Sequence, residues 1–181
     1  MKNIKFFLVA SGALLLASCG NNKGGVTGAP PRDEYVANIN KLAAEMHKAS
    51  SISEPTARVA IQVYSDFADY FPNDTLAPAY LFKAGEIATA AKKYKTALGF
   101  YQTITSKYKD YRFSKESLYL QGFLLDNFLN DDAAAKVIYE EVISKYPTTN
   151  YAGDAKAAIN NLGKTDEQLI EEFKKKNEGK R

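Results

Sequence analysis

The sequence predicts an all-α fold in which pairs of amphipathic helices stack side by side as a solenoid. Apolar residues recur at helical spacing through most of the chain, and one four-residue pattern returns after 37 and then 38 residues. The composition agrees, because 45% of the 181 residues are apolar and 12% are aromatic, which suits a domain with a substantial buried core.

The first 18 residues have the layout of a secretory signal peptide. Lys2 and Lys5 supply a short positive region, and residues 6–17 form an almost uninterrupted run of apolar and small residues. That run is too short to cross a bilayer comfortably as a helix, which needs about 20 residues. The segment closes with the string Leu16-Ala17-Ser18-Cys19-Gly20.

The string around Cys19 resembles the lipobox of bacterial lipoproteins, in which a leucine and two small residues precede an acceptor cysteine. The resemblance implies that a diacylglyceryl group joins the Cys19 thiol, that the chain is cleaved before Cys19, and that the new amino group is acylated. Two or more acyl chains, at roughly 0.8 kcal/mol per buried methylene, hold a protein stably on a bilayer. The alternative is an ordinary signal peptide with an incidental cysteine. Because Cys19 is the only cysteine, the chain can form no intramolecular disulfide.

Residues 19–32 are expected to form a flexible tether, because this stretch is rich in Gly, Asn and Pro and has no apolar period. A helical domain is expected over residues 33–177, followed by a disordered tail at 178–181. The apolar spacing and the turn signals predict eight helices. Their expected ranges are 33–50, 54–71, 77–91, 94–107, 113–129, 132–146, 151–162 and 165–177.

The repeated pattern is an alanine followed by three apolar or aromatic residues at spacings of four, three and four, which places all four on one helix face. The copies are Ala60, Tyr64, Phe67 and Phe71; Ala97, Tyr101, Ile104 and Tyr108; and Ala135, Tyr139, Val142 and Tyr146. The intervening helices share a second pattern with a glycine where two helices must approach closely. It consists of Leu81, Ala84, Gly85 and Ala88, and then of Leu118, Gln121, Gly122 and Leu125. The expected repeat-packing residues are Gly85, Ala97, Gly122 and Ala135.

Cap signals fall at the joints between these helices, at Asn73 with Asp74, Asp131 with Asp132, and Thr165 with Gln168. The last helix is expected to close the solenoid. Its Leu169, Ile170 and Phe173 would face inward and its charged residues outward, as in a terminal repeat with a polar outer face.

The two patterns together resemble the tetratricopeptide repeat, in which a small residue of the first helix precedes an alanine of the second by twelve positions. Gly85 and Ala97 fit this interval, and Gly122 and Ala135 exceed it by one, as a one-residue loop insertion would produce. The resemblance implies a right-handed α-solenoid of about four helix pairs. The period departs from the usual ~34 residues, and Gln121 stands where an apolar residue is expected.

The longer period and the strings ending at Pro72 and Pro147 are similar to the periplasmic branch of this superfamily. That branch includes outer-membrane assembly lipoproteins of the BamD type and Tol-Pal coordinators of the YbgF type. The likeness covers roughly residues 33–177. It implies a lipid-anchored protein of the outer membrane whose helical domain faces the periplasm and binds other envelope proteins or peptides.

In this repeat family, residues of the first helices that do not face the core line a concave groove. Counted from the glycines, the resemblance points to Phe82 and Glu86 in one unit and to Tyr119, Phe123 and Asp126 in the next. Aromatic residues with isolated carboxylates suit an extended or helical peptide. The alternative is that Phe82 and Tyr119 pack between the units.

The chain shows no footprint for nucleic acid and no metal or cofactor motif. The net charge is +3, and loss of Lys2 and Lys5 with the signal lowers the 24 basic residues to 22, against 21 acidic ones. His47 is the only histidine, so neither a histidine metal cluster nor a histidine-based catalytic triad can form. No cofactor, metal or small-molecule substrate is therefore expected.

Two alternatives stay open beside a non-catalytic scaffold. A cell-wall hydrolase or accessory enzyme would require a deep pocket with converging carboxylates of raised pKa. The triplet Asp74-Thr75-Leu76 resembles an acceptor site for O-linked glycans in some bacterial groups, which would make Thr75 a glycosylation site. The alternative for that triplet is a helix-entry cap.

Overall fold

The computed structural model describes residue 28 and residues 30–178, which form eight α-helices joined by short turns. Their bounds are α1 Arg32–Lys48, α2 Glu54–Tyr70, α3 Ala77–Ala90, α4 Tyr94–Lys107, α5 Ser114–Asn127, α6 Asp132–Lys145, α7 Asn150–Asn161 and α8 Asp166–Glu178. Every bound lies within two residues of the range expected from the sequence. The expected signal segment, Cys19 and most of the tether lie outside the described residues. None of the helices described here has the length and apolar character needed to cross a bilayer.

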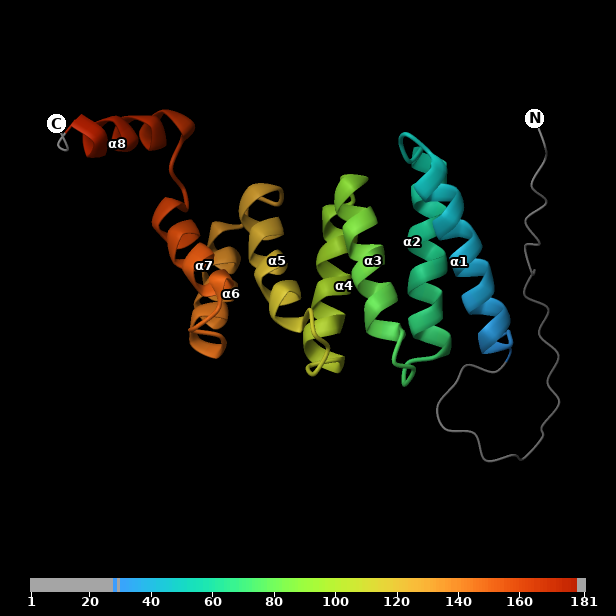
Figure 1. The fold of residues 1–181 in the computed structure, drawn as a ribbon. Coiled ribbons are helices and arrows are strands. Elements are labelled where there is room, and N and C mark those ends of the chain that lie inside the picture. Colours follow the sequence, from blue (N-terminus) through green and yellow to red (C-terminus); the bar gives the residue numbers. More distant parts are fainter. Residues whose placement is uncertain (1–27, 29, 179–181) are drawn as a thin grey trace.

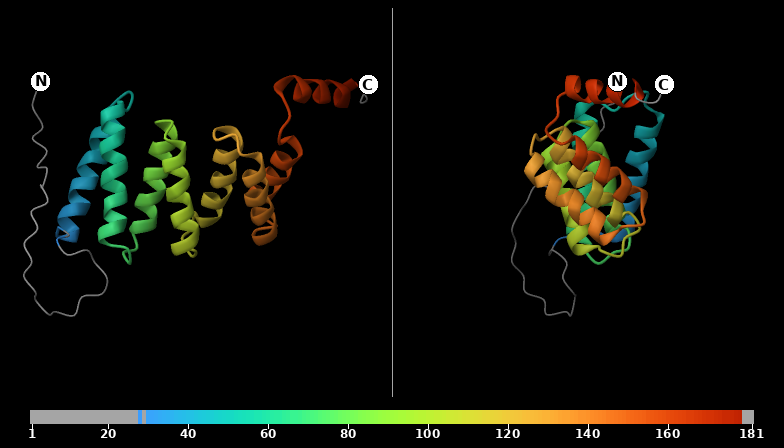
Figure 2. Two further views of the ribbon diagram at one scale, coloured as in Figure 1. Left: turned by 180° about the vertical axis from the view of Figure 1, so that it is seen from behind. Right: turned by 90° about the vertical axis from the view of Figure 1, so that its left-hand side faces the viewer.

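Helices α1 to α7 stand side by side in chain order (Figure 1). From α2 to α7 each helix packs closely on the next, and α5 also contacts α7. Figure 2 shows the same single row from behind. The prediction of an all-α solenoid built from consecutive helix pairs is confirmed.

A glycine and a tyrosine set the helix crossing in each of the two central pairs. A Cβ atom added to Gly85 would lie 2.7 Å from Cε1 of Tyr101, and one added to Gly122 would lie 2.7 Å from Cε1 of Tyr139. Any larger residue would therefore push the ring out of its place. Ala97 and Ala135, one turn before these tyrosines, are fully buried. The two short side chains of each unit thus leave room for the ring and for the close approach of the helices.

Gln121 departs from the apolar pattern and is nevertheless buried. Its Nε2 donates to Thr105 Oγ1 on α4 at 3.0 Å and to the Ser117 carbonyl oxygen at 3.3 Å. Because a buried amide is costly only when it lacks partners, these bonds explain why a polar residue is tolerated there. The bond to Thr105 also joins one helix pair to the next.

The one-residue insertion expected between Gly122 and Ala135 lies in the α5–α6 joint. Three residues separate α3 from α4, and four separate α5 from α6. In both joints one non-glycine residue adopts the left-handed conformation, Lys92 with φ 59° and Asn130 with φ 53°. These residues turn the chain so that the following amide donates back to the end of the first helix.

Two of the expected caps are present as hydrogen bonds. The Asp131 side chain accepts from the Ala134 amide at 3.0 Å, which starts α6. Thr165 and Gln168 form a reciprocal capping box, with the Thr165 amide donating to Gln168 Oε1 at 2.9 Å and the Gln168 amide donating to Thr165 Oγ1 at 3.3 Å. The second cap starts α8 as a separate helix.

The expectation that α8 closes the solenoid is wrong. Helix α8 turns away from the row (Figure 1), and its Ile170 and Phe173 side chains are 54% and 68% exposed. The physical reason lies in the linker, where Gly163 adopts a left-handed φ of 72° and redirects the chain before the capping box begins the new helix. An ion pair of 2.7 Å between Lys164 Nζ and Glu172 Oε2 ties α8 to that linker rather than to α7.

Candidate functional site

The first candidate surface lies where α5 meets α7, and we call it the α5–α7 face. Tyr119, Phe123 and Asp126 follow one another at helical spacing along α5 and are all half-buried. The ring of Tyr151 on α7 lies 5.6 Å from that of Tyr119, and the ring of Tyr139 lies 5.8 Å from it on the core side. The face therefore presents aromatic rings whose inner edges are packed and whose outer parts meet solvent.

Carboxylates border these rings. Burial raises the pKa of the Tyr119 hydroxyl, and Asp154 and Asp126 raise it further. Burial, Glu116 and Asp154 act in the same way on the pKa of Tyr151. Each of these shifts shows a carboxylate near a phenol that is partly removed from water. Such a combination attracts a cationic group and offers it a ring face to stack on.

Asp126 is held in place by the core. The Tyr139 hydroxyl donates to Asp126 Oδ2 at 3.2 Å, which ties the carboxylate to α6. Burial raises the pKa of Asp126, and the hydrogen bond from Tyr139 opposes that shift in part. A cation brought to this face would relieve the cost of keeping the carboxylate ionised.

The corresponding part of α3 is different, and the expectation that Phe82 lines an open groove is wrong. Phe82 is only 6% exposed. Its ring stacks on Phe113 at 5.0 Å and contacts Tyr111 at 6.5 Å, because the turn between α4 and α5 folds over it. Arg112 covers Phe113 in turn, with its guanidinium carbon 4.3 Å from the ring centroid. Glu86 is exposed and pairs with Lys83 at 2.8 Å.

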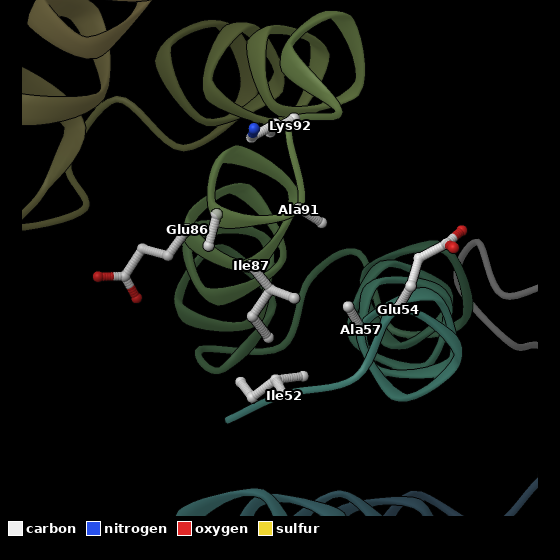
Figure 3. Close-up of a pocket in the computed structure, with 8 residues that line it drawn as sticks. Ile52, Glu54, Ala57, Glu86, Ile87, Ala91 and Lys92 are labelled. Atoms are coloured by element: carbon white, nitrogen blue, oxygen red, sulfur yellow. The ribbon is translucent and has the colours of Figure 1, made fainter. Parts of the chain in front are cut away.

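A second candidate surface is an apolar cavity of about 630 Å³ between α2, α3 and the loop that precedes α2. We call it the N-terminal cavity. Its lining consists of Ile52, Glu54, Ala57, Glu86, Ile87, Ala90, Ala91 and Lys92. Figure 3 shows Ile52 and Ile87 directed toward the space between α2 and α3.

The charged residues of this cavity lie at its rim. In Figure 3 the carboxylates of Glu54 and Glu86 point away from each other on opposite sides. They do not form the converging pair that an acid–base mechanism needs at this cavity. Within the described part of the chain, no three His, Cys, Asp or Glu residues come together as a possible metal site.

Comparison with known families agrees with the paired-helix geometry. A family model described as tetratricopeptide repeat matches residues 116–149, which run from the first turn of α5 through α6 to the start of α7. The chain contains a tetratricopeptide repeat. No curated protein sequence matches the chain. Tetratricopeptide repeats generally bind other proteins, and the matched repeat is the one that carries Tyr119, Phe123 and Asp126.

Sequence reasoning missed several residues of the two surfaces in this repeat protein. Tyr151 and Asp154 belong to α7, whose glycine, Gly153, is part of neither repeated glycine pattern, so counting from Gly85 and Gly122 did not reach them. Ile52 lies in a loop and follows no helical period. Phe128 is 38% exposed and stacks on Tyr94 at 4.2 Å, next to Phe123. The sequence signal for Tyr151 was its position in the first turn of a predicted helix.

Proposed function

We propose that this chain is a non-catalytic scaffold that binds proteins or peptides of the bacterial envelope. In this proposal a lipid on Cys19 holds it on the outer membrane, with the helical domain in the periplasm. The binding role rests on the α5–α7 face, where the half-buried Tyr119 and Asp126 of the matched repeat lie beside Tyr151 and Asp154 of the following helix. The complete lipobox string and the likeness to the periplasmic BamD and YbgF type branch support the location.

The chemistry of the face favours a partner segment that combines a lysine or arginine with an apolar anchor. The rings of Tyr119 and Tyr151 offer area for stacking, and Asp126 and Asp154 supply negative charge beside them. A guanidinium or ammonium group can stack on the rings and pair with the carboxylates at the same time. Phe123 and its neighbour Phe128 offer an adjoining apolar patch for the anchor.

The binding role is tested with a partner cross-linked to the wild-type protein in intact cells and then purified. Tyr119→Ala should weaken its binding by about 1–3 kcal/mol, as truncation of an anchor residue does. Val137→Ala is the matched control, because Val137 is 61% exposed on α6, away from this face. Equal affinity of the wild type and of both variants would show that the α5–α7 face does not bind this partner.

The anchor is tested separately by following fatty-acid incorporation. The wild type should take up a labelled fatty acid and fractionate with outer membranes, whereas Cys19→Ala should take up none. The variant should then appear in the soluble periplasmic fraction or persist as the uncleaved precursor. A wild type that carries no label, or a variant that stays wholly with the membrane, would refute lipid attachment at Cys19.

A further inference from the structure

Large apolar side chains are exposed at both ends of the solenoid. Five large apolar residues are exposed among the described residues, and three of them belong to only two places. Ile170 and Phe173 lie on α8, and Ile52, which is 45% exposed, lines the N-terminal cavity. Clustered exposed apolar groups mark contact surfaces more often than single ones do.

Helix α8 presents a narrow apolar face, and no other helix of the described residues packs extensively on α8. Leu169, Ile170 and Phe173 fall on one side of the helix by their spacing, and Leu169 is half-buried. The reciprocal cap at its start and the ion pair with the linker make α8 a formed helix even though it does not pack in the row. A formed amphipathic helix docks into a groove through anchors at such positions.

The N-terminal cavity matches this face in size and in character. Ile52, Ala57 and Ile87 give it an apolar interior, and its volume of about 630 Å³ lies within the ~300–1,000 Å³ of protein sites that bury a ligand. The alanines at the end of α3 have short side chains and leave space in that part of the cavity lining. Side chains of the size of isoleucine and phenylalanine are therefore suitable occupants.

The charges at the borders of the two surfaces are complementary. Lys174 follows Phe173 and borders one side of the apolar face of α8, and Glu172 borders the other. The cavity rim carries Lys92 and the carboxylates of Glu54 and Glu86, which form exposed pairs with Arg58 and Lys83 of their own helices. An α8 helix seated in the cavity can bring Lys174 to one of these carboxylates and Glu172 to Lys92, in exchange for weak exposed pairs such as the one between Glu172 and Lys164. Such contacts fix the orientation of docking.

Helix α8 cannot reach the cavity of its own chain. The row of helices places α8 at one end and the cavity beside α2 and α3 near the other (Figure 1), and Figure 2 shows the same separation from behind. Only the short linker at 162–165 joins α8 to α7. An α8 helix that docks in this cavity must therefore belong to a second molecule.

We propose that α8 of one copy docks into the N-terminal cavity of a second copy, so that the chains associate head to tail. The donor surface, α8, and the acceptor surface, the N-terminal cavity, are different. An assembly of any length therefore keeps a free cavity at one end and a free α8 at the other. The association is consequently open-ended, and its extent rises with concentration. This inference does not depend on which other protein the α5–α7 face binds.

The test uses the full chain with Cys19→Ala, which excludes micelles formed by a lipid. Molar mass is measured by light scattering and sedimentation over a wide range of concentration. The parent chain should increase in mass as concentration rises. A donor-deficient variant, Ile170→Asp with Phe173→Asp, and an acceptor-deficient variant, Ile52→Asp with Ala90→Asp, should each stay monomeric. All four positions are exposed, so both variants should melt as the parent does.

An equimolar mixture of the two variants distinguishes this arrangement from other forms of association. Each variant retains the surface that the other lacks, so the mixture should form a dimer and grow no further. Val137→Asp, which changes an exposed residue outside both surfaces, is the matched control and should associate like the parent.

Three results would overturn the proposal. The first is a parent chain that stays monomeric at every concentration. A monomer whose α8 is protected from hydrogen exchange by its own chain is one form of this result. The second is a mass increase that neither variant abolishes. The third is a mixture of the two variants that stays monomeric.

Discussion

The helix pairs α3–α4 and α5–α6 share their interior and differ on their outer face. In both pairs a glycine receives a tyrosine ring and an alanine lies fully buried one turn before that tyrosine. On the outer face the α4–α5 turn covers Phe82, whereas the equivalent Tyr119 stays half open beside Tyr151. The repeat thus constrains the residues between paired helices and leaves the face of the first helices free to vary.

A second difference concerns the group that the buried tyrosine meets. The Tyr139 hydroxyl donates to the carboxylate of Asp126, whereas Thr89 occupies the equivalent position near Tyr101. Burial raises the pKa of Tyr101 to about 12 and raises that of Tyr139 further, where Asp126 contributes. The second pair therefore carries a charge that the first lacks, and this charge lies on the proposed binding face.

The largest expected difference between the pairs comes from truncating the outer aromatic residue. Phe82→Ala should lower the free energy of unfolding by about 3–5 kcal/mol, because it empties a packed site. Tyr119→Ala should cost clearly less, because part of that ring already meets water. Urea unfolding followed by circular dichroism measures both values. Equal losses would mean that the two aromatic residues have the same structural role.

The shared interior is tested at the glycines. Gly85→Ala and Gly122→Ala should each cost roughly 1–3 kcal/mol, because the new Cβ overlaps a tyrosine ring. In a Tyr101→Leu background the cost of Gly85→Ala should shrink or reverse, since alanine favours helix by ~1 kcal/mol over glycine. A double-mutant cycle from thermal melts measures this coupling. Additive effects would show that the ring contact does not set the crossing.

The joints between the paired helices provide a smaller effect. Lys92 adopts a left-handed conformation that asparagine tolerates better, as Asn130 does in the second pair. Lys92→Asn should therefore stabilise the fold by up to ~1 kcal/mol, and Asn130→Lys should destabilise it by a similar amount. Chemical unfolding of the two variants beside the wild type measures the difference. A loss of stability in Lys92→Asn would contradict this account.

The smallest expected effect is the pH dependence contributed by Asp126. Its pKa is raised in the folded state, so the wild type loses stability as pH rises through that raised pKa. Asp126→Asn lacks this loss, so its stability relative to the wild type should improve as pH increases over the same window. Thermal melts of both proteins from acid to neutral pH measure the trend. Parallel curves would show that Asp126 titrates as it does in the unfolded chain.

The local part of this structure follows from the sequence alone. Each helix could be predicted from apolar spacing and turn residues, because a helix depends mainly on residues three and four positions apart. The pattern of Gly85 with Ala97 and of Gly122 with Ala135 predicted the paired architecture, because only small residues fit where helices cross closely. The caps at Asp131 and Thr165 were predictable for the same reason, since each acts within one turn.

Which outward faces are covered depends on contacts between segments that are distant in sequence. Phe82 and Tyr119 have equivalent positions and similar side chains, and a turn about thirty residues away in sequence buries the first of them. The apolar spacing of α8 shows which residues share a face but not whether another helix packs on that face. The N-terminal cavity likewise combines a loop residue, Ile52, with Ile87 of α3. Periodicity records the side on which a helix is apolar, whereas burial depends on distant segments that the period does not describe.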